Sequence, residues 1–387
     1  MIKIEKIKLR NILNSAGKKA LEVEITTDTG ISEMASTPSA IMPGKREILE
    51  INNIKDKDLN EFLVNICNTN IENQEMFDSI LDNYMDKIGT SIGLALSLAF
   101  ARICAKNEAI NLVEYIERVS NYTERKISPK PLVTIFSGGV HNKKEKGSIQ
   151  NIMIVVDIHP FSEAVKAITE IYTDLENRLK EKALLKGYAA SSGMIVENMS
   201  TNEKFKMVTE SIKALKYDKK VSIAIDVAAE HFYENGSYCY EGKMMEAEQL
   251  SKILMQYVRE YNITYMEDPF DSTDEKYWKK FREENPEILI VGDDLFATQE
   301  KYINSKLANG IIIKMNQVGT LTGTIKAIEK AKSEKMLIAV SHRSIETEDT
   351  FMCDLAVALN AEFIKIGGPR RGDRIAKYNR LLRLEEY

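Results

Sequence analysis

VSIAID, residues 221–226, is the first of six short apolar runs that follow one another in the second half of the chain. Each run has the length of a β-strand, is rich in Ile, Val or Leu and is bounded by turn-forming residues, which is typical of a buried strand. Each run carries an ionisable side chain at or near its end. The other five are ITYMED (263–268), ILIVGDD (288–294), IIIKMNQ (311–317), LIAVSH (337–342) and FIKIGG (363–368).

Segments with helical periodicity alternate with these runs, at 246–261, 274–284, 322–335 and 350–361. Strands that alternate with helices predict βα units around a buried parallel sheet. An open, doubly wound sheet would also fit this pattern. Because so many consecutive units lack a Gly-rich phosphate turn, we favour an α/β fold with a closed (β/α)8 barrel of the TIM type. The active site of such a barrel lies at the carboxyl ends of the strands.

The side chains at the six strand ends would therefore converge on one mouth. A lone Asp there is more simply a helix cap and a lone Lys a solvated charge, but six successive strand ends are harder to explain in that way. Carboxylates from separate strands suit Mg²⁺, and a lysine held near the metal is shifted towards its neutral form and can act as a base. This set can remove a proton α to a carboxylate while the metal stabilises the ene-diolate. The six residues are Asp226, Glu267, Asp293, Lys314, His342 and Lys365.

Composition is that of an ordinary soluble globular protein. The 387 residues are 44% hydrophobic and 29% charged, with a net charge of −5, so nothing indicates binding to nucleic acid. The longest apolar stretch, 92–101, is too short to span a bilayer, and residues 1–11 lack the apolar core of a signal peptide. Four cysteines without CxxC spacing predict reduced thiols in a cytoplasmic protein.

The first third of the chain predicts a separate, smaller unit. A strand-like segment at 1–10 precedes an alternating run at 20–26, and after a turn signal at 28–30 the segment 31–35 is expected to return antiparallel to that run as a hairpin. Three helical patterns follow at 58–68, 74–86 and 91–105. A polar linker at 121–130 divides an α+β domain, residues 1–126, from the barrel domain, residues 127–387. The barrel domain opens with strands at 132–136 and 152–157 and helices at 162–185 and 202–215, before the βα series.

Several long segments resemble those of the enolase family. They are VGDDL (291–295), IIIKMNQVGTL (311–321), SHRSIETEDT (341–350), IKIGGP (364–369) and RIAKYNRLLRLEE (374–386), and LEVEITTDTG (21–30), PLVTIFSGGVH (131–141) and DVAAEHFY (226–233) extend the match over nearly the whole chain. The resemblance implies an N-terminal α+β domain that caps a barrel opening ββαα(βα)6. It also implies dependence on Mg²⁺ and a homodimer or higher homo-oligomer.

The resemblance further implies a role for individual residues. Asp226, Glu267 and Asp293 match the metal ligands, and Lys314 matches the base that removes the proton at C2 of 2-phosphoglycerate. Lys365 matches the lysine that contacts the substrate carboxylate. The remaining matches are His342 near the substrate, Arg343 and Ser344 on its phosphate, His141 in a loop that closes over the site, and Gln150 after that loop.

The main departures from the family pattern are at the two positions where enolases carry acidic glutamates. Enolases follow the glutamine with a glutamate, whereas this chain has Asn151, and Ser192 aligns with the glutamate that protonates the leaving hydroxyl. Met42 aligns with a serine that helps to bind a second Mg²⁺, and Ile345 replaces a glycine beside the phosphate site. A positioned general acid contributes roughly 10²–10⁴ in rate. Because hydroxide is a poor leaving group, dehydration of 2-phosphoglycerate should suffer most from this loss.

Three hypotheses follow. The chain is a divergent Mg²⁺-dependent carbon–oxygen lyase that acts on another small-molecule carboxylate, which could be phosphorylated. Alternatively, it is an authentic phosphopyruvate hydratase that interconverts 2-phosphoglycerate and phosphoenolpyruvate in glycolysis and gluconeogenesis. The third hypothesis is a catalytically silent binding protein. Bringing charged side chains together at one barrel mouth costs desolvation free energy. A protein without catalytic function has no physical need for such a cluster, so the cluster favours an enzyme.

Overall fold

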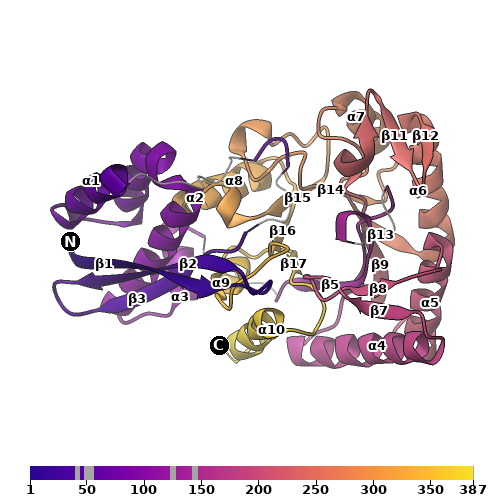
Figure 1. Ribbon diagram of the computed structural model, residues 1–387, viewed down its shortest axis with the longest axis horizontal. Helices are drawn as coiled ribbons and strands as arrows, with labels where there is room; N and C mark the ends of the chain where they lie inside the picture. Colours follow the sequence, from indigo (N-terminus) through magenta and orange to yellow (C-terminus); the bar gives the residue numbers. More distant parts are fainter. Residues whose placement is uncertain (40–43, 48–55, 123–127, 142–146, 387) are drawn as a thin grey trace.

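The computed structural model describes residues 1–39, 44–47, 56–122, 128–141 and 147–386, and Figure 1 shows them as two parts. One part is a small sheet with helices, and the other is a barrel. Met42 and the expected boundary between residues 126 and 127 lie outside the described residues. The exact boundary between the expected domains, residues 1–126 and 127–387, therefore stays a prediction.

The N-terminal part is an antiparallel sheet with helices packed on it. The expected turn at 28–30 joins the second and third strands, and the sheet order is β3-β2-β1-β4. The two expected helices at 74–86 and 91–105 form one element, interrupted at Gly89, where φ is +77°. The strands are β1 (Ile2–Leu13), β2 (Lys19–Thr27), β3 (Ser32–Ser36) and β4 (Asn70–Ile71), and the helices are α1 (Asp56–Cys67), α2 (Gln74–Asn107) and α3 (Leu112–Val119).

Helix α2 is the core helix of this part. Among the described residues it is the one helix that is long and apolar enough to cross a membrane, but 89% of its most apolar window is buried inside the protein. Phe77 and Phe100 stack within it, with ring centroids 4.2 Å apart. Burial of this kind is that of a core helix in a soluble fold.

The second part is the closed eight-stranded barrel that the strand pattern predicts. β17 pairs with β5 to close it, and β6 runs antiparallel to both of its neighbours, β5 and β9. The reversed second strand gives the expected ββαα opening before the βα series. The strands are β5 (Lys130–Ser137), β6 (Asn151–Val156), β9 (Val221–Asp226), β13 (Ile263–Glu267), β14 (Leu289–Gly292), β15 (Gly310–Ile313), β16 (Leu337–Ser341) and β17 (Phe363–Lys365).

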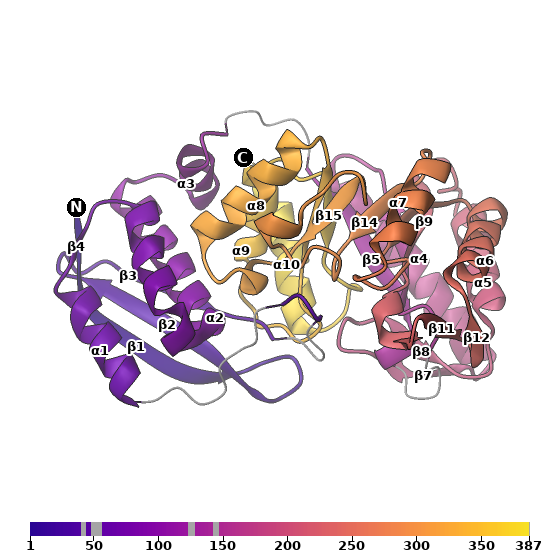
Figure 2. The ribbon, with the colours of Figure 1, turned by 90° about the horizontal axis from the view of Figure 1, so that it is seen from above.

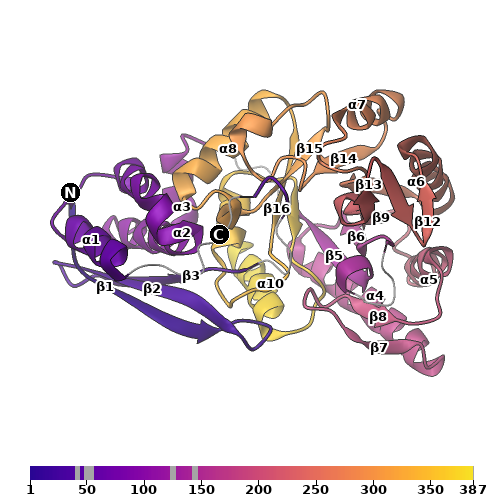
Figure 3. The same ribbon diagram turned by 45° about the horizontal axis from the view of Figure 1, so that its top comes forward.

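Helices cover the outside of the barrel (Figure 3). A separate buried cluster from the barrel strands includes Leu132, Tyr265 and Ile312, and such a layer makes the barrel a packed core rather than a pore. The helices are α4 (Phe161–Glu181), α5 (Thr201–Ala214), α6 (Ala247–Tyr261), α7 (Glu275–Glu284), α8 (Leu321–Ser333), α9 (Phe351–Ala358) and α10 (Gly372–Leu384).

Short elements that the sequence did not predict lie in the connections. A hairpin follows α4, and a three-stranded meander follows β9, while only a 3-10 turn, η3 (Glu300–Tyr302), lies between β14 and β15. The expected helix at 162–185 accordingly ends at Glu181, and Leu185 begins a strand. The hairpin is β7 (Leu185–Tyr188) and β8 (Met194–Val196), and the meander is β10 (Tyr233–Glu234), β11 (Ser237–Tyr240) and β12 (Lys243–Met245).

The N-terminal part docks on the barrel through α2, which lies beside α8 (Figure 2). Two side chains of α2 bind the first backbone N–H groups of α8. Leu321 N donates to Ser97 Oγ (2.9 Å) and Thr322 N donates to Asp78 Oδ2 (2.8 Å). The first N–H groups of a helix have no partners within the helix. The N-terminal part therefore supplies acceptors for two N–H groups at the start of α8.

Candidate active site

The six strand-end side chains lie together at the carboxyl end of the barrel. Asp226, Glu267 and Lys365 are the last residues of β9, β13 and β17, whereas the other three follow directly after β14, β15 and β16. A cavity of about 70 Å³ is lined by five of them, and the sixth, the fully buried Glu267, accepts a hydrogen bond from Lys365. Parallel strands present their carboxyl ends at one edge, so the sequence pattern leads directly to this cluster.

Lys365 lies between two of the carboxylates. Its Nζ donates to Asp226 Oδ2 (2.9 Å) and to both oxygens of Glu267 (2.8 and 2.9 Å), and the three side chains are nearly fully buried. Burial alone would lower the pKa of Lys365, but the attraction of Asp226 and Glu267 outweighs it and raises the pKa. A divalent cation on the same carboxylates would cancel that attraction and shift the lysine towards its neutral form.

Lys314 faces the third carboxylate. Its Nζ forms an ion pair with Asp293 Oδ2, and its backbone N–H donates to Thr298 Oγ1 (2.9 Å). Burial would raise the pKa of Asp293, but Lys314 and Lys365 hold it below its usual range. Within the described residues no hydrogen-bond donor reaches Asp293 Oδ1, although this oxygen is buried. An ionised, buried oxygen without a partner is suited to a cation.

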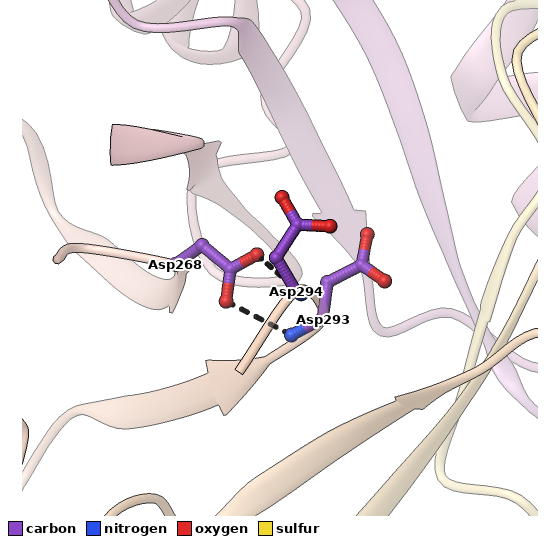
Figure 4. A group of neighbouring side chains, drawn as sticks. All are labelled: Asp268, Asp293 and Asp294. Carbon is purple, nitrogen blue, oxygen red and sulfur yellow. Dashed lines mark hydrogen bonds between the residues drawn. The ribbon is translucent and has the colours of Figure 1, made fainter. Parts of the chain in front are cut away.

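Asp268 and Asp294 extend the acidic cluster (Figure 4). One oxygen from each of Asp268, Asp293 and Asp294 lies within 4.8 Å of the others. However, the two oxygens of Asp268 accept the backbone N–H groups of Asp293 (2.9 Å) and Asp294 (2.8 Å). Asp268 therefore holds the turn that carries Asp293, a role that no sequence pattern predicted.

The donor set fits a divalent metal ion. Asp226, Glu267 and Asp293 bring buried carboxylates from three strands, which are the oxygen ligands that Mg²⁺ prefers. Oδ1 of Asp293, which has no partner among the described residues, is free to bind a cation. These carboxylates also form ion pairs with Lys314 and Lys365, so a metal ion and the two ammonium groups would bind to the same carboxylates.

The two histidines of the expected set are neutral near pH 7. Burial lowers the pKa of His141 to about 4, against the attraction of Asp226. Burial also holds the pKa of His342 well below its usual range, and the nearby Arg374 cation adds to this. Both side chains line the cavity, as does His231. Neutral imidazoles there can shape the pocket and exchange hydrogen bonds without adding charge.

Arg343 and Ser344 also line the cavity, in the loop after β16. Arg374, fully buried on α10, holds this loop by donating to the carbonyls of Arg343 (3.1 Å) and Ser344 (2.8 Å). Ile345, which we expected beside the phosphate site, follows Ser344 and forms a backbone bridge with Ser39 of the N-terminal part.

Uncharged side chains lie in the part of the cavity where the family pattern has its acidic glutamates. Asn151 donates to Asp226 Oδ2 (3.0 Å), and Gln150 reaches the same oxygen at 3.4 Å. Ser137 Oγ lies 3.1 Å from Asn151 Oδ1 and 3.3 Å from Ser191 Oγ.

Ser192, which aligns with the family's acid, is directed elsewhere. Its hydroxyl donates to the carbonyl of Arg370 (2.9 Å), and the side chain is fully buried. Its neighbour Ser191 lines the cavity instead. Neither serine places a titrating acid beside the strand ends.

Comparison with known proteins agrees with this geometry over the whole chain. The family model for the enolase N-terminal domain matches residues 4–116, and the model for the enolase C-terminal TIM barrel domain matches residues 125–387. A curated relative named Enolase, from Sulfurisphaera tokodaii, is 34% identical over 406 residues, which cover 99% of this chain and 95% of the relative. The chain therefore belongs to the enolase family, a family of hydro-lyase enzymes.

Proposed function

We propose that this chain is a Mg²⁺-dependent lyase that removes a proton α to the carboxylate of a small substrate, and that it acts poorly or not at all on 2-phosphoglycerate. One observation supports the second half of the proposal. Asn151 and the serines around it form an uncharged hydrogen-bond chain where the family carries acid glutamates. An amide cannot protonate a leaving hydroxide.

Lys314 is our proposed base. It lines the cavity, its backbone N–H donates to Thr298, and its ammonium group pairs with Asp293. Lys365, at the end of β17 and two strands away from β15, would bind the substrate carboxylate. Mg²⁺ on Asp226, Glu267 and Asp293 would supply the positive charge that stabilises an ene-diolate.

The remaining residues would position the substrate. Arg343 and Ser344 form the cationic side of the cavity and are our candidates for binding an anionic group such as a phosphate. His141, His342 and Gln150 line the rest and would exclude water and donate or accept hydrogen bonds.

An authentic phosphopyruvate hydratase is the second candidate. The relative named Enolase matches this chain over almost its full length, and the base and the three metal carboxylates of the family pattern are present. On this alternative, another group would protonate the leaving hydroxyl, and the enzyme would serve glycolysis and gluconeogenesis.

Two rates measured on one sample separate the candidates. With 2-phosphoglycerate and Mg²⁺ in D₂O, phosphoenolpyruvate is followed by its ultraviolet absorbance and exchange of the C2 proton by NMR. We expect exchange that is at least about 10²-fold faster than dehydration, because only dehydration needs the acid. Dehydration at ordinary enzyme rates, about 1–10³ per second, would overturn the proposal in favour of the hydratase.

Asn151→Glu is the matching variant. The new carboxyl would lie beside Asp226, and a like charge raises the pKa of a carboxyl, so it could hold a proton to donate. If the missing acid is the main defect, dehydration should rise by roughly 10²-fold or more while proton exchange changes little. No rise would point to a pocket shaped for a different substrate.

We also propose a cytoplasmic location and a homodimer or higher homo-oligomer, as in the family. All four cysteines are free thiols, which supports a reducing compartment. Light scattering on the purified protein would measure the oligomeric state directly.

A further inference from the structure

Glu47, in the N-terminal part, forms an ion pair with Arg343, the arginine that we propose binds the anionic group of the substrate. Glu47 Oε1 accepts from Arg343 Nη1 (3.0 Å), and Glu47 Oε2 accepts from Arg343 Nη2 (2.9 Å). The side chains are only 6% and 4% exposed. Two parallel charge-assisted bonds of this kind form the strongest common contact of a guanidinium group.

The turn that carries Glu47 is fixed to the barrel by its neighbours. Lys45 forms an ion pair with the buried Asp271, and Arg46 donates to the carbonyl of Leu295 (2.6 Å) and pairs with Glu275 (3.0 Å). Glu47 therefore reaches Arg343 from an anchored backbone.

Further hydrogen bonds complete the contact. Gln317 Nε2 donates to Glu47 Oε1 (3.0 Å), and Gln317 in turn accepts from Thr298 Oγ1 (2.7 Å), the atom that also binds the backbone of Lys314. The carboxylate of Glu47 is thus held in the same hydrogen-bonded network as the proposed base. This network favours one defined position for Glu47 on Arg343.

The bonds that Glu47 makes argue that this position cannot persist when an anion binds to Arg343. Glu47 lines the same cavity as Arg343, and its carboxylate occupies Nη1 and Nη2 of the guanidinium group. A phosphate would also need the same two N–H groups of Arg343.

We propose that Glu47 is an internal competitor for the anion site, so that the anionic group of the substrate must displace it from Arg343 before it can bind there. This inference rests on the proposed use of Arg343 for anion binding. It makes Glu47 a residue that sets affinity and specificity. Substrates whose anion binds an arginine fork more strongly than a carboxylate does, such as phosphates, would be selected over simple dicarboxylates.

The test is the binding of inorganic phosphate to the metal-free full chain, measured by calorimetry. Glu47→Gln removes the competing charge but keeps the size of the side chain, and we expect it to tighten phosphate binding about tenfold or more. Phosphate should also raise the melting temperature of this variant more than that of the wild type, because a ligand that binds only the folded state stabilises it.

Glu275→Gln is the matched control. It removes the same charge from a residue that anchors the same turn through Arg46, but Glu275 does not contact Arg343. The phosphate affinity of this control should stay within about twofold of the wild type. If Glu47→Gln fails to fold, Glu47→Asp, whose shorter arm weakens the fork, should still tighten phosphate binding several-fold.

Arg343→Met in the Glu47→Gln background separates the two proposals. If it abolishes phosphate binding but Glu47→Gln alone binds no tighter than the wild type, the competitor role is wrong and the anion site stands. If phosphate binding survives the loss of Arg343, the anion site itself is wrong. Equal tightening in Glu47→Gln and Glu275→Gln would also overturn the inference, since it would reflect a loosened turn.

Discussion

At the scale of single residues, Lys314 carries the proposed chemistry without being a candidate metal ligand. Replacing it by alanine removes the amine that would accept the α-proton, so we expect proton exchange to fall by roughly 10²–10⁴. Its loss removes a cation that competes for Asp293, and binding of Mg²⁺ measured by calorimetry should be retained or tightened. Lys330→Ala on α8, whose ion pair with Glu334 lies outside the site, is the control. An active Lys314→Ala enzyme would contradict the assignment of the base.

Asp268 allows a second test at this scale, because its two oxygens hold the backbone of Asp293 and Asp294. Its φ of +44° is a conformation that asparagine tolerates, so Asp268→Asn should fold. The amide can keep only one of the two acceptors. We expect Mg²⁺ affinity, measured by calorimetry, to fall about 10–100-fold, as for other residues that orient metal ligands. Unchanged affinity would contradict this role, and complete loss would make Asp268 a ligand itself.

Which residues meet at the site was only partly predictable from the sequence. The rule that parallel strands end at one edge brought Asp226, Lys314 and Lys365 together, because each closes or follows a strand that periodicity identifies. Glu47 could not be found in this way. It reaches Arg343 across 296 residues of sequence and from another domain, and no local pattern encodes that contact.

At the scale of elements, the first N–H groups of α8 donate to side chains of α2 in the other domain. One of these acceptors, Asp78, is titratable. It accepts from Ser97 Oγ (2.6 Å), Gln74 Nε2 (3.0 Å) and Thr322 N (2.8 Å). Burial raises its pKa from 3.8 to about 6, although the hydrogen bonds from Ser97 and Thr322 oppose the rise. A raised carboxyl pKa means that the folded state binds the proton more tightly than the unfolded state does.

The stability that this group contributes is therefore fully present below about pH 4 and is lost as the pH rises through about 6. This difference in pKa between the folded and unfolded states corresponds to a loss of about 3 kcal/mol. We expect the free energy of unfolding of the wild type, minus that of Asp78→Asn, to fall by about this amount between pH 4 and pH 7 in denaturant titrations. A difference that is constant with pH would mean that Asp78 does not titrate in this range.

Long apolar or periodic elements were predictable, and short polar ones were not. All six apolar runs and the helices between them appear within a few residues of their expected ends, because burial imposes period and composition on them. The meander β10–β12 consists of strands of two to four residues with tyrosines and charges, which carry too little periodicity to identify. The break at Gly89, by contrast, falls between the two helices expected at 74–86 and 91–105.

At the scale of the whole molecule, the cap and the barrel should unfold together, because each satisfies polar groups of the other. Arg102 on α2 forms two bonds with Asp349 of the barrel (2.8 and 2.7 Å) and one with the carbonyl of Met34 (2.6 Å). Asp349 also accepts the backbone N–H groups of Ser36 and Phe351, so one carboxylate joins a strand of the cap to the start of α9.

Arg102→Met tests this coupling. It leaves a mostly buried carboxylate without its cation, and the side chains of the pair are 19% and 11% exposed, so we expect a loss of about 2–3 kcal/mol, somewhat less than for a fully buried pair. Arg118→Met is the control, because its ion pair with Glu108 lies within the cap and is exposed, and it should cost less than about 1 kcal/mol. In calorimetry both variants should melt in a single transition. A separate early transition in Arg102→Met would show that the cap folds independently, and the contacts of Asp78 and Glu47 with the barrel would then be too weak to hold the two parts in one cooperative unit.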